Sequence, residues 1–154
     1  MILFLDFDGV LHPDPCDRRD WFCQLPLLEN VLRQHPHVDV VISSSWRYDH
    51  SLEQLRGTFA EDLRSRIVGV TPTDARPQVE DWMPQALLPS HHREIECRKW
   101  LQRYRSTQTH WLAIDDVREW FAPDCKNLLV TDSGKGFRPE QVEFLEKCIK
   151  DTTG

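Results

Sequence analysis

The sequence opens on an apolar run that ends in two closely spaced acids, MILFLDFDGVLH. Four consecutive apolar residues, 2–5, are typical of a buried strand in a parallel sheet. Asp6 and Asp8 then lie where the strand ends, which is where open α/β sheets bind ligands, and Gly9 lets the backbone turn. Such a cluster of negative charge predicts a hard divalent cation such as Mg²⁺. The competing interpretation is a strand followed by a plain Asp-Gly turn.

The composition indicates one soluble globular domain over residues 1–154. The chain is long enough for a sizeable core, and its 40% apolar and 29% charged residues are unlike those of a disordered protein. A net charge of −6 argues against indiscriminate binding to nucleic acid or to an anionic membrane. Four arginines form either a solvated helix face or a local basic groove: Arg93, Arg98, Arg103 and Arg105.

Cysteine and histidine usage predicts a reduced, cytoplasmic protein without zinc. The five cysteines are odd in number and contain no C-x-x-C pair, so free thiols are expected. The histidines include the adjacent pair His91-His92, but no His or Cys pair has the spacing of a zinc site. Neither a signal peptide nor a membrane-spanning run of about 18 apolar residues is visible, so we expect no contact with a membrane.

Hydrophobic periodicity predicts alternating strands and helices. Strands are expected over residues 2–6, 38–43, 67–70, 111–115 and 127–131. Helices are expected over residues 25–35, 51–59, 93–104 and 138–150. Residues 71–89 contain four prolines and are predicted as a long irregular loop with a short helical piece near Trp82. This alternation is typical of an α/β fold with a parallel sheet covered by helices on both faces.

Four polar features fall at or just after the ends of these strands, or at the start of a helix beside them. They are Asp6 and Asp8, the serines Ser43, Ser44 and Ser45, the pair Asp115 and Asp116, and Arg93. Because the carboxyl ends of parallel strands meet at one edge of a sheet, we expect these side chains to converge. Taken singly, the second acid pair could be a cap, the serines a polar turn and the arginine a surface residue.

Together these residue types suit phosphoryl transfer. One carboxylate can attack phosphorus and carry the phosphoryl group as an acyl phosphate, and a second can protonate the leaving oxygen and then activate water. A serine hydroxyl and its neighbouring backbone N–H can hold a phosphoryl oxygen, and the second acid pair completes a metal site. A basic residue is needed because two unit charges about 4 Å apart cost roughly 4 kcal/mol at an effective dielectric near 20.

The motifs resemble those of the haloacid dehalogenase (HAD) superfamily, most of whose members are Mg²⁺-dependent phosphatases. FLDFDGVL is similar to the first motif, VVISSSW to the second and AIDD to the fourth. The third motif, a lone cation, aligns with Arg93, with Arg98 and Lys99 as alternatives. The pattern DFDGVLHP…ISSSWR further resembles the small HAD domains associated with RNA-repair proteins. The resemblance implies a Rossmann-like three-layer sandwich whose five or so parallel strands follow the order 3-2-1-4-5.

The resemblance also implies roles for individual residues. Asp6 is implied as the nucleophile and Asp8 as the general acid and base, with Mg²⁺ held by Asp6, by the backbone carbonyl of Asp8 and by the acids of the fourth motif. The other implied residues are Asp115 and Asp116 for the metal, Ser43 or Ser44 for the phosphate, and Arg93 for catalysis and substrate binding.

The two candidate insertion points, residues 9–24 and 71–92, are too short for a separate cap domain. The site is therefore expected to be open and to admit a large phosphorylated substrate, such as a polynucleotide end or a phosphoprotein, although the net charge does not support nucleic acid. Trp21, Trp46 and Trp82 could stack on a base or cover apolar surface. The alternatives are a small-molecule or nucleotide phosphatase, a non-catalytic HAD-fold binding module, which intact Asp6 and Asp8 disfavour, and a zinc-binding regulator.

Overall fold

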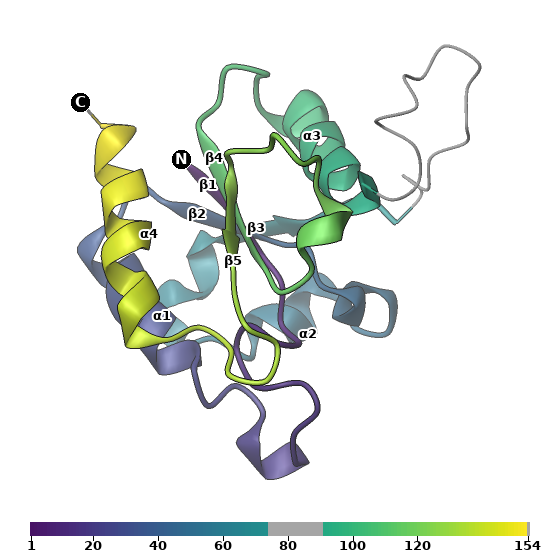
Figure 1. Ribbon diagram of the computed structural model, residues 1–154, viewed down its shortest axis with the longest axis vertical. Coiled ribbons are helices and arrows are strands. Elements are labelled where there is room, and N and C mark those ends of the chain that lie inside the picture. Colours follow the sequence, from purple (N-terminus) through teal and green to yellow (C-terminus); the bar gives the residue numbers. More distant parts are fainter. Residues whose placement is uncertain (74–90, 154) are drawn as a thin grey trace.

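The computed structural model describes residues 1–73 and 91–153. Five strands form one parallel sheet in the order β3-β2-β1-β4-β5 (Figure 1). The strands are β1 (Ile2–Leu5), β2 (Asp39–Ile42), β3 (Ile67–Val70), β4 (Trp111–Asp115) and β5 (Leu128–Val130). The principal helices are α1 (Leu25–Gln34), α2 (Leu52–Arg56), α3 (His92–Tyr104) and α4 (Pro139–Asp151). The predicted α/β class and strand order are confirmed.

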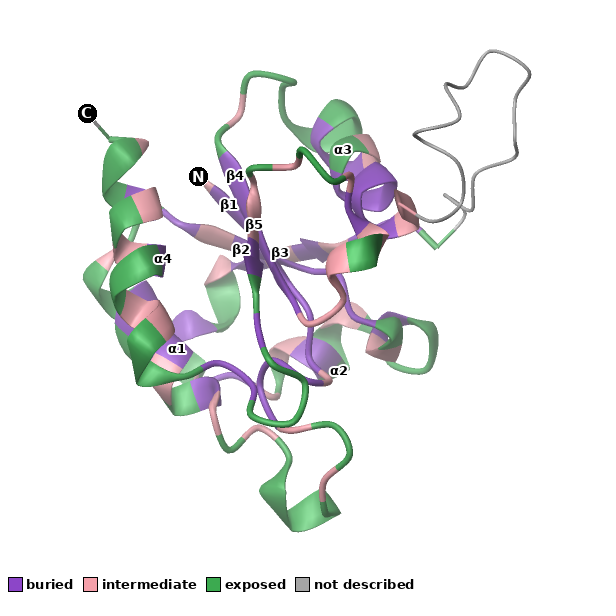
Figure 2. Ribbon diagram, in the orientation of Figure 1, coloured by how far each residue is buried: buried purple, intermediate pink, exposed green. Residues whose placement is uncertain are grey.

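Both faces of β1 are buried because the strand lies in the middle of the sheet between two helical layers (Figure 2). Leu3 and Leu5 point into a core that the apolar faces of α1 and α4 complete. Ile2 and Phe4 point the other way, into a core shared with α3. The Phe4 ring meets the Trp100 ring edge to face, with centroids 5.9 Å apart. Because side chains alternate along the strand, β1 packs against the helical layers on both faces of the sheet.

The predicted helix over residues 51–59 is shorter in the structure, where α2 ends at Arg56. Its start agrees with a capping box, in which the Ser51 hydroxyl accepts from the backbone N–H of Gln54 and the Gln54 side chain accepts from that of Ser51. Gly57 stops the helix, and Phe59 still reaches the core from the following turn. The prediction was wrong there because one apolar periodicity spans both segments.

The connection from β1 to α1, at the carboxyl edge of the sheet, contains no folded insertion. Within residues 6–24 the only regular element is a short 3₁₀ helix, Arg18–Asp20. The expected loop over 71–89 and the helical piece near Trp82 lie outside the described residues, apart from residues 71–73. Among the described residues, no helix has both the length and the apolar character that crossing a bilayer requires.

Candidate active site

The carboxyl ends of β1 and β4 lie side by side because these strands are neighbours in the sheet. Leu5 pairs with Ile114, and the backbone N–H of Asp6 donates to the Ile114 carbonyl at 3.1 Å. Asp6 and Asp115 therefore leave adjacent strands at the same level, and Asp116 follows directly. One carboxylate oxygen from each of these three acids lies within 4.8 Å of the other two. We call Asp6, Asp115 and Asp116 the three-acid cluster.

Burial makes the negative charge of this cluster costly. Asp6 is 5% exposed and Asp115 is fully buried. Burial, and then the charge of Asp115, raises the pKa of Asp6 well above its ordinary value. Burial raises the pKa of Asp115 to about 7, although Arg93 opposes the rise. Burial also raises the pKa of Asp116. Three desolvated carboxylates this close cannot all be ionised without positive charge nearby.

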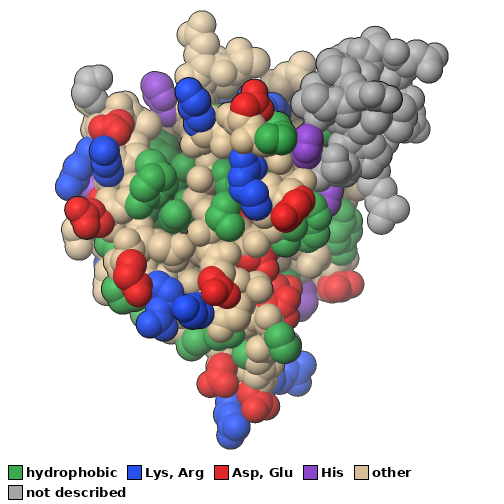
Figure 3. Space-filling model, in the orientation of Figure 1, with side chains coloured by type: hydrophobic (Ala, Val, Ile, Leu, Met, Phe, Trp, Pro, Cys, Tyr) green, Lys and Arg blue, Asp and Glu red, His purple; other side chains and the backbone are tan. Residues whose placement is uncertain are grey.

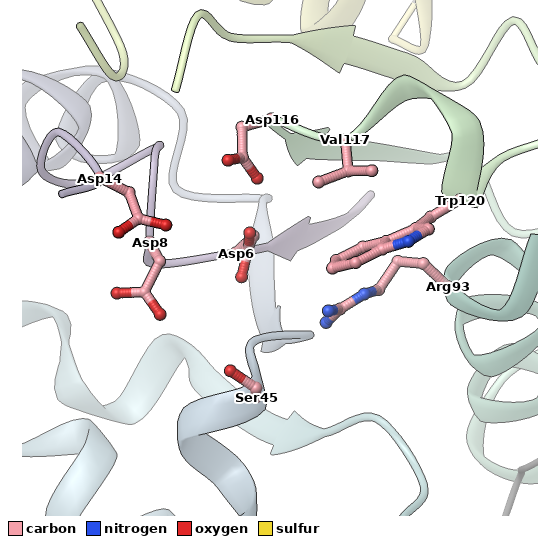
Figure 4. A pocket seen from close by; sticks show the side chains of 8 residues that line it. All are labelled: Asp6, Asp8, Asp14, Ser45, Arg93, Asp116, Val117 and Trp120. Carbon is pink, nitrogen blue, oxygen red and sulfur yellow. The ribbon is translucent and has the colours of Figure 1, made fainter. Parts of the chain in front are cut away.

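Arg93 supplies a buried positive charge against the cluster. It lies in the first turn of α3, and its Nε is 3.7 Å from Asp115 Oδ2. Its guanidinium lies over the Trp120 ring, 5.0 Å from the ring centre (Figure 4). Burial alone would lower the pKa of Arg93, but the charges of Asp6, Asp115 and Glu96 raise it above its ordinary value. The guanidinium therefore stays charged although it is buried.

The two alternative cations on α3 point elsewhere. Arg98 lies five positions beyond Arg93, about 140° around the helix, and its side chain is 57% exposed. It pairs with Glu94 at 2.8 Å and lies over the Trp111 ring. Within the described part of the chain, neither Arg98 nor Lys99 forms an ion pair with the three-acid cluster. The structure thus brings Arg93, and not its alternatives, to the acids.

A second buried pair, Arg47 and Glu96, holds Arg93 in place. Arg47 Nη2 lies 3.0 Å from Glu96 Oε2, and Glu96 Oε2 lies 3.9 Å from Arg93 Nε. Arg47 also donates to the carbonyls of Ser44 at 2.8 Å and Thr71 at 3.1 Å. This guanidinium therefore ties the segments that follow β2 and β3 to α3. Loss of either member of the pair would leave a buried charge without its partner, which is strongly destabilising.

The three serines after β2 have different surroundings. Ser43 continues the sheet, its backbone N–H donating to the Leu5 carbonyl at 2.9 Å. The Ser44 hydroxyl accepts from the backbone N–H of Trp46 at 3.2 Å and caps the 3₁₀ helix Ser45–Tyr48. Both residues are buried, whereas Ser45 lines the pocket with Asp6 and Asp8. Of the three serines, Ser45 lines the pocket, and the predicted phosphate-binding residues Ser43 and Ser44 do not.

Asp8 faces the same pocket as Asp6, but its carboxylate lies outside the three-acid cluster. Trp46 Nε1 lies 3.1 Å from both Asp8 oxygens, and His12 Nε2 lies 2.8 Å from Oδ1. The backbone N–H of Phe22 donates to His12 Nδ1 at 3.2 Å, so the ring proton belongs on Nε2 and points at Asp8. The Asp8 side chain is thus held by Trp46 and His12 at the pocket, outside the three-acid cluster.

Gly9 is required where it stands. Its φ is +75°, which side chains with a Cβ rarely adopt, and a Cβ built there would overlap the Asp116 carboxylate. The Gly9 carbonyl accepts a hydrogen bond from the Thr131 hydroxyl at 2.7 Å, which joins the turn after β1 to the end of β5. The glycine thus lets the turn pass close to Asp116.

These side chains line a pocket of about 200 Å³ at the carboxyl edge of the sheet (Figure 4). Its walls are formed by Asp6, Asp8, Asp14, Ser45, Arg93, Asp116, Val117 and Trp120. Five residues in or beside the pocket were not predicted as site residues from the sequence: Asp14, Trp120, His12, Arg47 and Glu96. His12, Arg47 and Glu96 are charged or polar residues at buried positions, whereas Asp14 is exposed and Trp120 is half-buried, and a single position of this kind leaves no pattern in the sequence.

The donor set of the three-acid cluster fits a hard divalent cation. Carboxylate oxygens are the ligands that Mg²⁺ prefers. Asp115 Oδ2 is buried and has no hydrogen-bond partner among the described residues, as expected of an oxygen reserved for an ion. Across residues 1–73 and 91–153 no group of His and Cys side chains converges in the same way, so this part of the chain offers zinc no site of its preferred ligands.

A comparison with protein families gives one match over nearly the whole chain. Residues 2–142 match the model of a family described as the HAD domain in Swiss Army Knife RNA repair proteins. No curated protein and no solved structure matches the chain.

The raised carboxyl pKa values predict how stability depends on pH. With EDTA present, the free energy of unfolding should fall as the pH rises from near 4 through about 7, the pKa of Asp115. A carboxyl whose folded-state pKa is raised keeps a proton that the unfolded chain releases, so its contribution is lost as the pH rises through the folded value. Urea unfolding at a series of pH values measures this slope.

Asp115→Asn should flatten the slope, and the exposed Asp124→Asn serves as the matched control that keeps it. An unchanged or steeper slope in Asp115→Asn would contradict the electrostatic account of the cluster.

Proposed function

The chain belongs to the HAD superfamily, as a domain of the kind found in Swiss Army Knife RNA repair proteins, and from this premise we propose that it is a Mg²⁺-dependent phosphatase that removes a terminal phosphate from a polynucleotide. One observation carries the proposal. Asp6 stands on the wall of a pocket between two further carboxylates and a buried guanidinium, where an oxygen nucleophile and charge compensation are both at hand.

Asp6, Asp115 and Asp116 would hold the Mg²⁺. When bound, the ion offsets the negative charge that the phosphoryl group brings beside the carboxylates. It would also favour the ionised form of Asp6, whose pKa is raised by burial in the metal-free protein.

The chemistry then falls to the protein's own side chains. A carboxylate oxygen of Asp6 attacks phosphorus, the bond from phosphorus to the ester oxygen breaks, and protonated Asp8 gives its proton to the departing oxygen. In the second step, Asp8 takes a proton from a water molecule as that water attacks phosphorus. The acyl phosphate bond breaks, inorganic phosphate leaves and Asp6 is regenerated. The Arg93 guanidinium and the Ser45 hydroxyl orient the phosphoryl oxygens, since both line the pocket.

His12 and Trp46 act as positioning residues for Asp8. Both contact its carboxylate, and the backbone N–H of Phe22 fixes the tautomer that turns the His12 proton toward Asp8. A donor on each side limits rotation of the carboxylate, which keeps one geometry through both proton transfers.

The surroundings of the pocket favour the end of a chain as substrate. Between β1 and α1 the chain forms no folded insertion, which favours a phosphate attached to a large molecule. On the face shown in Figure 3, acidic and basic side chains are interspersed without a continuous basic surface. With a net charge of −6, the protein is suited to binding a terminal nucleotide rather than a long stretch of nucleic-acid backbone.

Asp6→Asn should abolish turnover of a terminally phosphorylated oligonucleotide and of an aryl phosphate in Mg²⁺, because an amide cannot carry the phosphoryl group. Release of inorganic phosphate measures the rate, with EDTA expected to stop the unaltered protein. Asp20→Asn, in the 3₁₀ helix before α1, is the matched control and should keep the full rate. Full activity in Asp6→Asn would refute the proposed nucleophile, and an unaltered protein without activity would leave the binding-module alternative.

Asp8→Asn should lower kcat by about 10² to 10⁴ while Mg²⁺ still binds, since general acid and base catalysis is worth this much and the Asp8 carboxylate lies outside the three-acid cluster. Phosphate release gives the rate, and titration calorimetry with Mg²⁺ gives the affinity. Unchanged kinetics would remove Asp8 from the mechanism.

A further inference from the structure

A second pocket of about 420 Å³ adjoins the catalytic pocket and shares Asp8 and Ser45 with it. Its other walls are Arg18, Trp21, Trp46, Asp49 and His50. We propose that this pocket binds the nucleobase of the nucleotide that carries the phosphate to be removed. The inference rests on the proposed phosphatase function, because it names the part of the substrate next to the reacting group.

Planar side chains line most of this pocket. The Arg18 guanidinium lies over the Trp21 ring, 5.0 Å from its centre. The Trp21 ring meets the Trp46 ring at 5.0 Å and 73°, and His50 stacks on Trp46 at 5.2 Å and 22°. Trp21 keeps 38% of its surface exposed, although a tryptophan is costly to leave in water. Aromatic rings and a guanidinium offer the stacking surfaces that bases use, and each stack is sequence-tolerant because every base has a π-face.

Trp46 is a fixed wall of this pocket. Its indole N–H donates to Asp8, and its ring packs against those of Phe7 and Phe22 with centroids 5.7 Å and 5.3 Å away. The backbone carbonyl of Trp46 contacts His50 Nδ1 at 3.1 Å. A wall that is ordered before the ligand arrives lowers the entropic cost of binding. The same indole therefore borders the base pocket and orients the proposed general acid.

The charges around the pocket favour one base over other groups that could accompany a phosphate. Asp49 places a carboxylate in the lining, where it can accept hydrogen bonds from the amino or ring N–H groups of a base. With Asp8 it would repel an acidic phosphopeptide. Among the described residues of the lining, Arg18 is the only lysine or arginine, which suits one nucleotide and not an extended polyanion.

Matched ligands test the proposal without depending on catalysis. The probes are dye-labelled oligonucleotides whose far end carries a non-hydrolysable phosphonate, at either the 3′ or the 5′ position. Each is compared with an analogue in which the phosphonate-bearing nucleotide lacks its base. Fluorescence polarisation in Mg²⁺ gives the dissociation constants.

We expect the base to tighten binding by about tenfold at one of the two ends, the worth of one stacked base. Trp21→Ala should remove most of this difference, because the ring it deletes forms part of the stack. Phe144→Ala on α4, an exposed aromatic outside both pockets, is the matched control that should keep it.

Equal affinity for base-bearing and base-free probes, or a difference that survives Trp21→Ala, would overturn the proposal. So would tighter binding of a phosphotyrosine peptide analogue than of either oligonucleotide. If the protein hydrolyses base-bearing and base-free phosphorylated ends equally well, the proposed phosphatase function would stand and the proposed base pocket would be ruled out. If the protein binds the base through Trp21 but releases no phosphate, the base pocket would stand and the proposed phosphatase function would be ruled out.

Discussion

A guanidinium buried among carboxylates is the interaction on which the rest of the site depends. Arg93 lies 3.7 Å from Asp115 and 3.9 Å from Glu96, and Glu96 in turn pairs with Arg47. Two positive charges thus face four carboxyl groups, because Asp6 and Asp116 belong to the same cluster. Charges removed from water are costly unless they are compensated. The remaining deficit of positive charge is the physical reason to expect a divalent cation here. The cation would in turn offset the negative charge of a bound phosphoryl group.

The order of the strands turns this local requirement into a pocket. β1 lies between β2 and β4, so the segments that follow these three strands meet at one edge of the sheet. The segment after β1 supplies Asp6, the proposed nucleophile, and Asp8, the proposed general acid and base. The segment after β2 supplies a serine hydroxyl and an indole, and the end of β4 supplies the acid pair. α3 adds the guanidinium from the layer beyond. Trp46 joins this chemistry to the aromatic pocket beside it, which would let recognition of the substrate and orientation of Asp8 depend on one side chain.

The sequence predicted the parts of the site that follow directly from a strand end. The apolar run before Asp6 and the one before Asp115 fix both positions, and a parallel sheet brings them together. The position of Arg93 at the start of its helix was also predicted from the sequence. By contrast, the sequence did not predict that Ser45 lines the pocket and Ser43 and Ser44 do not, because the direction of a turn depends on its hydrogen bonds and not on residue type. The contacts of His12 with Asp8 and of Arg47 with Glu96 join side chains whose pairing leaves no periodic pattern in the sequence.

The most direct test asks where the phosphoryl group goes. The protein is mixed with a phosphorylated oligonucleotide in Mg²⁺, quenched in acid within the first turnover and digested with pepsin, and the peptides are analysed by mass spectrometry. The account predicts one added phosphoryl group on the peptide that contains Asp6, located on that carboxylate and lost on treatment with hydroxylamine. Phosphate released with no phosphorylated peptide at any time, or a phosphoryl group on another residue, would contradict it.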